Sequence, residues 1–155
     1  MATTDSTQHR LGTVLVALQF ALIAFLAVIA VPVFLSGRAP LVAWAMAAAG
    51  MLLGLWALSS NRPGNFNIRP TPREGGQLVQ QGPYRWIRHP MYTAVIVCGL
   101  ACASAATSPW GWLGVAALVA VLATKATFEE RWMLAVHPDY AAYRERTRRF
   151  VPGIL

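Results

Sequence analysis

The longest run of apolar residues sets the first limit on this chain. Residues 11–35 contain no charged side chain, and as a helix these 25 residues would reach about 37 Å at about 1.5 Å per residue. The hydrocarbon core of a bilayer is about 30 Å thick. With 56% hydrophobic and 12% charged residues among 155, the composition excludes a water-soluble single domain. The run therefore predicts a membrane span.

Three further apolar segments predict an all-α, polytopic integral membrane protein with about four transmembrane helices in one membrane domain. The expected spans are residues 11–35, 41–58, 91–106 and 110–128. The third is short, about 24 Å, so it must extend into its flanks or sit in protein rather than in lipid. Ser108-Pro109 leaves so short a link that the last two spans should form an antiparallel hairpin.

The distribution of positive charge sets the expected orientation. The net charge is +7, and ten of the 13 Lys and Arg residues lie in two stretches, residues 62–88 and 129–155. Such an excess is typical of cytoplasmic segments, so the loop 61–90, the tail 129–155 and both termini are expected in the cytoplasm. The preference for Arg over Lys suggests a prokaryotic cytoplasmic membrane. Membrane lipids are expected partners and nucleic acid is not.

The connecting segments give weaker signals. Proline and glycine interrupt the loop 61–90, so no long helix is expected there, and its aromatic residues favour an ordered piece packed on the helix ends. After the fourth span the helix should continue to Val136, and Pro138 suits the first turn of a short helix through Arg148. Residues 1–10 are expected to be retained, because the apolar run after them is too long for a signal peptide.

Small and polar residues inside the spans are the next feature. Gly50 and Gly54 either mark a face where another helix approaches closely or are an incidental pair in an Ala-rich segment. Gln19 is most simply an interhelical hydrogen bonder. Lys125 either snorkels to the interface or pairs with Glu129 one helical turn away.

The hairpin should bring two chemically active segments together at the cytoplasmic face. The run Arg88-His89-Pro90-Met91-Tyr92 opens the third span, and Glu129-Glu130 closes the fourth. Structural alternatives exist for the first: Arg88 as a positive-inside anchor, His89 held extended before Pro90, and Tyr92 as an interfacial aromatic. The two carboxylates repel each other at a helix C-terminus, so they indicate a bound cation unless nearby basic residues neutralise them.

These residues also carry a family resemblance. The run Gly82-Pro83-Tyr84-Arg85-Trp86-Ile87-Arg88-His89-Pro90-Met91-Tyr92, preceded by Leu78-Val79, resembles the membrane methyltransferases of the isoprenylcysteine carboxyl methyltransferase family. The tail is similar to the family's second block, with Glu129-Glu130, then Tyr140 and Tyr143, then Arg149-Phe150-Val151-Pro152. Asn65-Phe66-Asn67 is a weaker match. The resemblance covers residues 61–155.

The resemblance implies methyl transfer from S-adenosylmethionine in a cytoplasm-facing pocket built by the last two helices, the loop before them and the tail. No metal is implied. Ala94 stands where the family often has Gly, and it is expected to tighten helix packing against the cofactor. His137-Pro138 stands where the family often has Phe-Gly, before the tyrosines of the tail. By carry-over, the cofactor-binding residues are Leu78, Val79, Tyr84, Arg88, His89, Pro90, Tyr92, Glu129 and Glu130, the catalytic candidates are His89, Glu130 and Arg149, and the substrate-binding candidates are Arg131 and Arg149.

The acceptor is less constrained than the donor. A lipophilic acceptor with a carboxylate is expected first, and phospholipid amines and thiols are alternatives. A carboxylate or thiolate needs no general base, so His89 would then be a binding residue; a neutral amine would make His89 or a glutamate the base. The rival of another class is a non-enzymatic helix-packing protein that uses Gly50 and Gly54. The sequence leaves the oligomeric state open.

Overall fold

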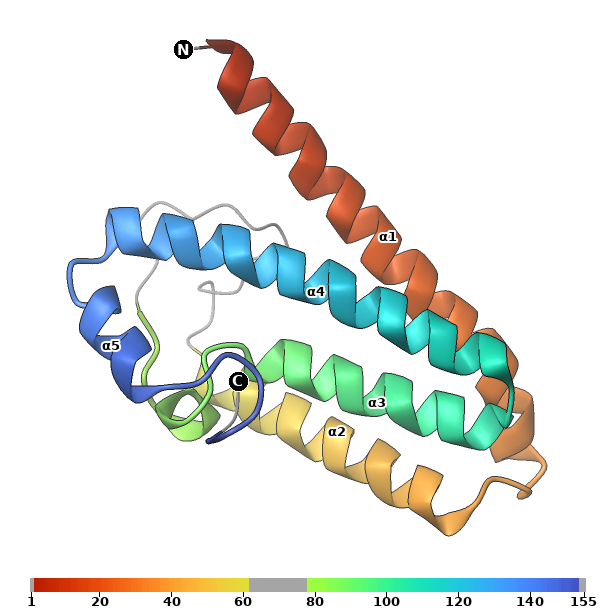
Figure 1. The fold of residues 1–155 in the computed structure, drawn as a ribbon. Helices are drawn as coiled ribbons and strands as arrows, with labels where there is room; N and C mark the ends of the chain where they lie inside the picture. Colours follow the sequence, from red (N-terminus) through yellow and green to blue (C-terminus); the bar gives the residue numbers. More distant parts are fainter. Residues whose placement is uncertain (1, 62–77, 154–155) are drawn as a thin grey trace.

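The computed structural model describes residues 2–61 and 78–153, with side chains from residue 10 onward. In these residues the chain forms only helices and turns apart from one isolated bridge, which confirms the all-α prediction. Three helices are long and apolar enough to cross a membrane. The elements, in chain order, are α1 (Ala2–Leu35), α2 (Leu41–Ser60), the 3-10 turn η1 (Gly82–Arg85), α3 (Pro90–Ala106), α4 (Pro109–Val136) and α5 (Tyr140–Arg146) (Figure 1).

The helix ends follow local sequence signals, with two departures from the prediction. Pro90 and Pro109 begin α3 and α4, where a missing N–H costs nothing. The first helix extends beyond the predicted span of residues 11–35, because α1 already begins at Ala2, nine residues before the apolar run. The last helix ends at Arg146 rather than at Arg148. Thr147 is extended there, and the Arg148 N–H donates to the carbonyl of Trp86 at 2.9 Å instead of continuing the helix.

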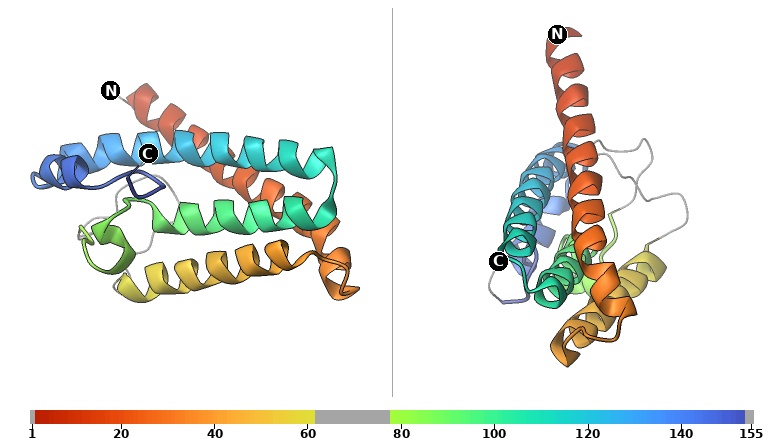
Figure 2. Two further views of the ribbon diagram at one scale, coloured as in Figure 1. Left: turned by 60° about the horizontal axis from the view of Figure 1, so that its bottom comes forward. Right: turned by 90° about the vertical axis from the view of Figure 1, so that its right-hand side faces the viewer.

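The short helix α3 is the centre of the bundle. It lies between α2 and α4. With α4 it forms the expected antiparallel hairpin, and α1 crosses α3 and α4 (Figures 1 and 2). Every residue of α3 is buried or half-buried. The helix is therefore largely surrounded by protein, which favours the second of the two alternatives for this segment.

The glycine pair of α2 is a helix contact and not an incidental feature. A Cβ atom on Gly50 would lie 2.6 Å from Cys98 Sγ and 3.0 Å from the Ala94 carbonyl oxygen, both in α3. A Cβ on Gly54 would lie 3.5 Å from Ala94 Cβ. Ala94 therefore tightens packing against α2. The expected packing of Ala94 against a cofactor stays a prediction.

The polar residues of the spans pair with each other. Lys125 is only 1% exposed and donates to Gln19 Oε1 at 2.6 Å, so α4 and α1 are joined by a buried hydrogen bond. The interhelical role expected for Gln19 is confirmed. Of the two roles considered for Lys125, snorkelling to the interface is wrong, because α1 provides a partner inside the bundle.

The loop before α3 is described only from residue 78 onward. Its 3-10 turn packs on the end of α2, where Gly82 has a positive φ of 58° and lies against Ser60 and Trp56. The Trp56 and Trp86 rings are 5.8 Å apart. An ordered piece on the helix ends is thus confirmed for this part. The Asn65-Phe66-Asn67 match lies outside the described residues.

Candidate functional site

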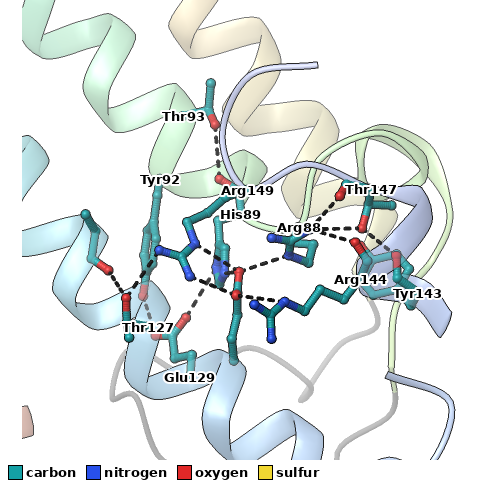
Figure 3. A network of polar contacts seen from close by, with 12 residues as sticks. Arg88, His89, Tyr92, Thr93, Thr127, Glu129, Tyr143, Arg144, Thr147 and Arg149 are labelled. Carbon is teal, nitrogen blue, oxygen red and sulfur yellow. Dashed lines mark hydrogen bonds and ion pairs between the residues drawn. The ribbon is translucent and has the colours of Figure 1, made fainter. Parts of the chain in front are cut away.

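Three segments meet at one end of the bundle: the start of α3, the end of α4 and the tail after α5 (Figure 3). Ile87 and Arg148 form a parallel bridge, the Arg88 N–H donates to the Arg148 carbonyl at 2.8 Å, and the His89 N–H donates to the Arg149 carbonyl at 3.1 Å. Main-chain hydrogen bonds therefore hold the tail against the residues that precede α3.

Glu130 is the centre of the polar network. Its Oε1 accepts hydrogen bonds from Arg88 Nε at 2.9 Å and Arg149 Nε at 3.2 Å, and its Oε2 accepts one from Arg149 Nη2 at 2.9 Å. His89 Nε2 lies 3.2 Å from Oε1, and Arg144 Nε lies 3.9 Å from Oε2. The carboxylate is buried, and cations face both of its oxygens. Its charge is therefore neutralised within the chain.

Arg88 also binds the tail directly. Its Nη1 donates to the carbonyl oxygens of Thr147 at 2.5 Å and Arg144 at 3.2 Å. The buried Thr147 hydroxyl donates to the Tyr143 carbonyl at 2.6 Å, and the Tyr143 hydroxyl donates to the Tyr84 carbonyl at 2.7 Å. A chain of hydrogen bonds thus runs from the loop through the tail to the start of α3.

His89 lies between the two glutamates. It precedes Pro90 in a non-helical conformation, which directs its ring toward the end of α4. Its Nδ1 is 3.5 Å from Glu129 Oε2, and its Nε2 is 3.2 Å from Glu130 Oε1. Burial alone would lower the pKa of His89, but hydrogen bonds and charge from both carboxylates outweigh burial and raise the pKa. Since both ring nitrogens face acceptors, the geometry suits the doubly protonated imidazolium.

Glu129 is the more open of the two carboxylates. The Tyr92 hydroxyl donates to its Oε1, and the Tyr92 ring stacks on His89 with 5.3 Å between centroids. The Glu129 side chain is 22% exposed, against 3% for Glu130. Phe150 in the tail lies 6.0 Å from the His89 ring. Glu129 is therefore the carboxylate of the pair that still has access for a cation.

The structure brings together most of the residues that the sequence singled out. Arg88, His89, Tyr92, Glu129, Glu130 and Arg149 lie in one network, and Pro90 starts the helix that carries it. Tyr84 lies close enough that burial and then the charge of Glu129 raise its pKa to about 12. Leu78 and Val79 are half-buried in the preceding segment. Arg131 is exposed and lies over the Phe128 ring instead, at 5.9 Å.

Sequence reasoning missed three threonines that complete the site. The Thr93 hydroxyl donates to the Phe150 carbonyl at 2.8 Å, Thr127 Oγ1 accepts from Arg149 Nη1 at 3.2 Å, and Thr147 accepts from Arg88 as described above. Each is an ordinary helix or tail residue by local pattern. A pairing of segments 57 residues apart, as for Thr93 and Phe150, left no local signal.

No metal cluster is found in the described part of the chain, where no three His, Cys, Asp or Glu side chains are placed to share an ion.

Comparison with known families gives one match. A family model described as phospholipid methyltransferase matches residues 39–139. That stretch contains the 88–92 run and both glutamates, and it ends before Arg149.

A curated relative adds a partial match. The chain is 32% identical over 84 residues to the cobalt-zinc-cadmium resistance protein CzcN of Cupriavidus metallidurans. The match covers 53% of this chain and 38% of that protein. The matched stretch is therefore well under half of the relative's length.

Proposed function

The chain belongs to the phospholipid methyltransferase family, and on that basis we propose that it transfers a methyl group from S-adenosylmethionine to a lipophilic acceptor. The family and the apolar helices make the chain an integral membrane methyltransferase. The resemblance to isoprenylcysteine carboxyl methyltransferases is confirmed, because both families belong to one group of membrane methyltransferases. The methyl donor, the acceptor and the residue roles below are our proposal.

The observation that carries the proposal is the different state of the two glutamates. S-adenosylmethionine bears a sulfonium, an ammonium and a carboxylate. Glu129 retains access at one end of this network, so a carboxylate is available for a cationic group of the donor. Glu130 is already neutralised by the chain's own cations. The residues present therefore fit the donor, with Glu129 as its acidic partner.

Glu130, Arg88 and Arg149 have a different role in this proposal. Their mutual hydrogen bonds hold the tail on the start of α3, and with it Phe150 beside His89. They act by keeping the donor-binding residues in place and by covering them from water. Leu78, Val79, Tyr84 and Pro90 are assigned to the cofactor by the family resemblance. Arg131 is exposed at the end of α4, where it can meet an acidic group of the acceptor.

Methyl transfer from a sulfonium to an anionic acceptor requires no proton transfer by the protein. The bound donor supplies a methyl group that its sulfonium already activates, so positioning and exclusion of water are the main requirements. His89 is held as an imidazolium by two carboxylates, which makes it a poor base and a good orienting group. This favours an acceptor that arrives as an anion, and we propose a carboxylate. Both termini and the site are proposed to lie on the cytoplasmic side.

A phospholipid amine is the second candidate, and the description of the matching family favours it. An amine must lose a proton before or during methylation, so this acceptor needs a base. Glu129 is then the candidate, because it is the accessible carboxylate of the pair. A thiol is the third candidate acceptor, since a thiolate also needs no base.

The test uses purified protein in vesicles of total bacterial lipid with S-adenosylmethionine carrying a radiolabelled methyl group. Label is expected in the lipid-soluble fraction, and alkali is expected to release it as volatile methanol, which methyl esters do and N-methyl groups do not. Glu129→Gln is expected to abolish the transfer, whereas Glu145→Gln, on the exposed face of α5, keeps it. Alkali-stable label would replace the carboxylate with an amine or thiol. A folded protein that binds no donor would overturn the proposal.

A further inference from the structure

Lys125 is a buried cation within a membrane-spanning helix. It lies in α4 (Pro109–Val136), is 1% exposed, and donates to Gln19 Oε1 at 2.6 Å. Charged groups inside spans are costly, and a lysine with a free path would extend its amine to the interface. The chain keeps this amine inside the bundle instead. Such a residue marks a functional site unless packing alone explains it.

The position of Lys125 relative to the site is specific. Its Nζ lies 5.1 Å from the centre of the Tyr92 ring, a cation–π contact. The same tyrosine donates its hydroxyl to Glu129 and stacks on His89, with an angle of 4° between the ring planes. Lys125 also precedes Glu129 by one helical turn. One aromatic side chain therefore links the buried amine to the open carboxylate.

The other partner comes from a part of the chain that the family match does not include. Gln19 lies in α1, and the match begins at residue 39. Gln19 is itself buried, and Leu15 one turn before it and Leu26 two turns after it are buried apolar residues of the same helix. The hydrogen bond to Lys125 therefore ties α1 to the site.

We propose that Lys125, held by Gln19, is a positioning residue for methyl transfer: it fixes the Tyr92 ring so that the tyrosine hydroxyl holds the Glu129 carboxylate toward the donor. The inference rests on the proposed function, because it takes Glu129 as the acidic partner of S-adenosylmethionine. It extends the site from the α3–α4 hairpin to α1. Neutral replacement of Lys125 should loosen Tyr92 and Glu129 while the apolar contacts of the bundle remain.

The first experiment measures S-adenosylmethionine binding to the full chain in detergent by calorimetry. Lys125→Met and Gln19→Leu are each expected to weaken binding about tenfold, an effect of the size found for coupled neighbours. Thr124→Val, an exposed position next to Lys125 on α4, is the matched control and is expected to bind as the wild type. If Lys125→Met does not fold, Gln19→Leu carries the test, since it removes the tether without removing the amine.

A double-mutant cycle separates positioning from general loosening. In a Tyr92→Phe background the bond to Glu129 is already lost, so Lys125→Met should weaken binding by less than about threefold. Full additivity of the two changes would overturn the proposal. Wild-type affinity in both Lys125→Met and Gln19→Leu would overturn it as well.

A second readout needs no ligand. Glu129, Glu130, Tyr92 and Phe150 lie around His89, so its ring resonances in histidine-labelled protein report on this cluster. They are expected to move in Lys125→Met and to stay in Thr124→Val. Unmoved resonances would contradict the positioning role. A wild-type chain that binds no S-adenosylmethionine would overturn the proposed function, and the His89 resonances would still decide whether Lys125 acts through Tyr92.

Discussion

At the scale of single residues, Glu129 and Glu130 illustrate how adjacent identical side chains acquire different roles. Successive residues of a helix differ by about 100° in direction. Glu130 therefore faces the arginines of the tail and of the 88–92 run, whereas Glu129 faces the Tyr92 hydroxyl. One carboxylate is used for structure and the other stays accessible, although the sequence assigned both to the cofactor and only Glu130 to catalysis.

Neutralising Glu130 is expected to destabilise the fold more than neutralising Glu129. Glu130→Gln leaves Arg88, His89 and Arg149 without their shared counter-charge, and breaking a buried ion pair costs about 3–5 kcal/mol. Glu129→Gln should cost far less stability and mainly reduce donor binding. Unfolding in detergent and calorimetry on the same samples check both effects, with Glu145→Gln as the exposed control. Equal stabilities of the two variants would contradict the assignment.

The contribution of His89 to stability is expected to fall as the pH rises above the ordinary pKa of histidine. The pKa of His89 in the folded protein is raised above its ordinary value of 6.5, so folding favours the imidazolium. The resulting stabilisation is complete below pH 6.5 and is lost as the pH rises through the raised pKa. Melting temperatures between pH 6 and pH 9 should decline in the wild type and decline less in His89→Asn. Parallel pH profiles in the two proteins would rule out this contribution.

At the scale of elements, the packing of α2 on α3 holds the site end of α3 in place. The two helices touch where Gly50 removes a side chain opposite Cys98 and the Ala94 carbonyl. Because α3 is short and has no exposed residue, its position depends on its neighbours and not on lipid. The hairpin with α4 then brings the 88–92 run to the two glutamates.

Substitutions of the two α2 glycines should have unequal effects. Gly50→Ala places a methyl group 2.6 Å from Cys98 Sγ, and overpacking of this kind costs about 1–3 kcal/mol. Gly54→Ala is the matched control, because its methyl group would make an ordinary contact at 3.5 Å. Unfolding of both variants in detergent measures the difference. A Gly50→Ala variant as stable as Gly54→Ala would show that the helices separate freely.

At the scale of the whole molecule, the site lies at one end of a bundle whose apolar faces are open to lipid. Exposed apolar side chains such as Val28, Leu35, Leu41 and Leu52 lie along α1 and α2. The short helix α5 and the tail lie at the end where α2 finishes and α3 begins (Figure 1), and the polar network joins them to the start of α3. The proposed lipophilic acceptor and water-soluble donor can meet at such an end.

The orientation of this bundle is testable by labelling in intact cells. In a background of Cys98→Ser and Cys102→Ser, a cysteine at Arg38 should react with a membrane-impermeant thiol reagent, because that turn is expected outside. A cysteine at Glu145 should react only after the membrane is permeabilised. Both positions are exposed, so reactivity reports the side of the membrane. The reverse pattern would place the site and the tail outside the cytoplasm.

The sequence was sufficient for the class of fold, the hairpin and the family. Apolar length, turn signals and the 88–92 run are local properties, and each is readable without knowing what the segment contacts. The same holds for Pro90 and Pro109 as helix starts, since proline constrains its own backbone. The early start of α1 at Ala2 was missed because polar residues there give no apolar signal.

Contacts between distant segments required the folded chain. Nothing local distinguishes Glu129 from Glu130, predicts that Lys125 finds Gln19 106 residues away, or pairs Thr93 with the tail. Each depends on which face of a helix meets which neighbour, and that is decided by packing of the whole bundle. A buried charge or hydroxyl must find a partner wherever the fold places one, so its partner is a property of the tertiary structure.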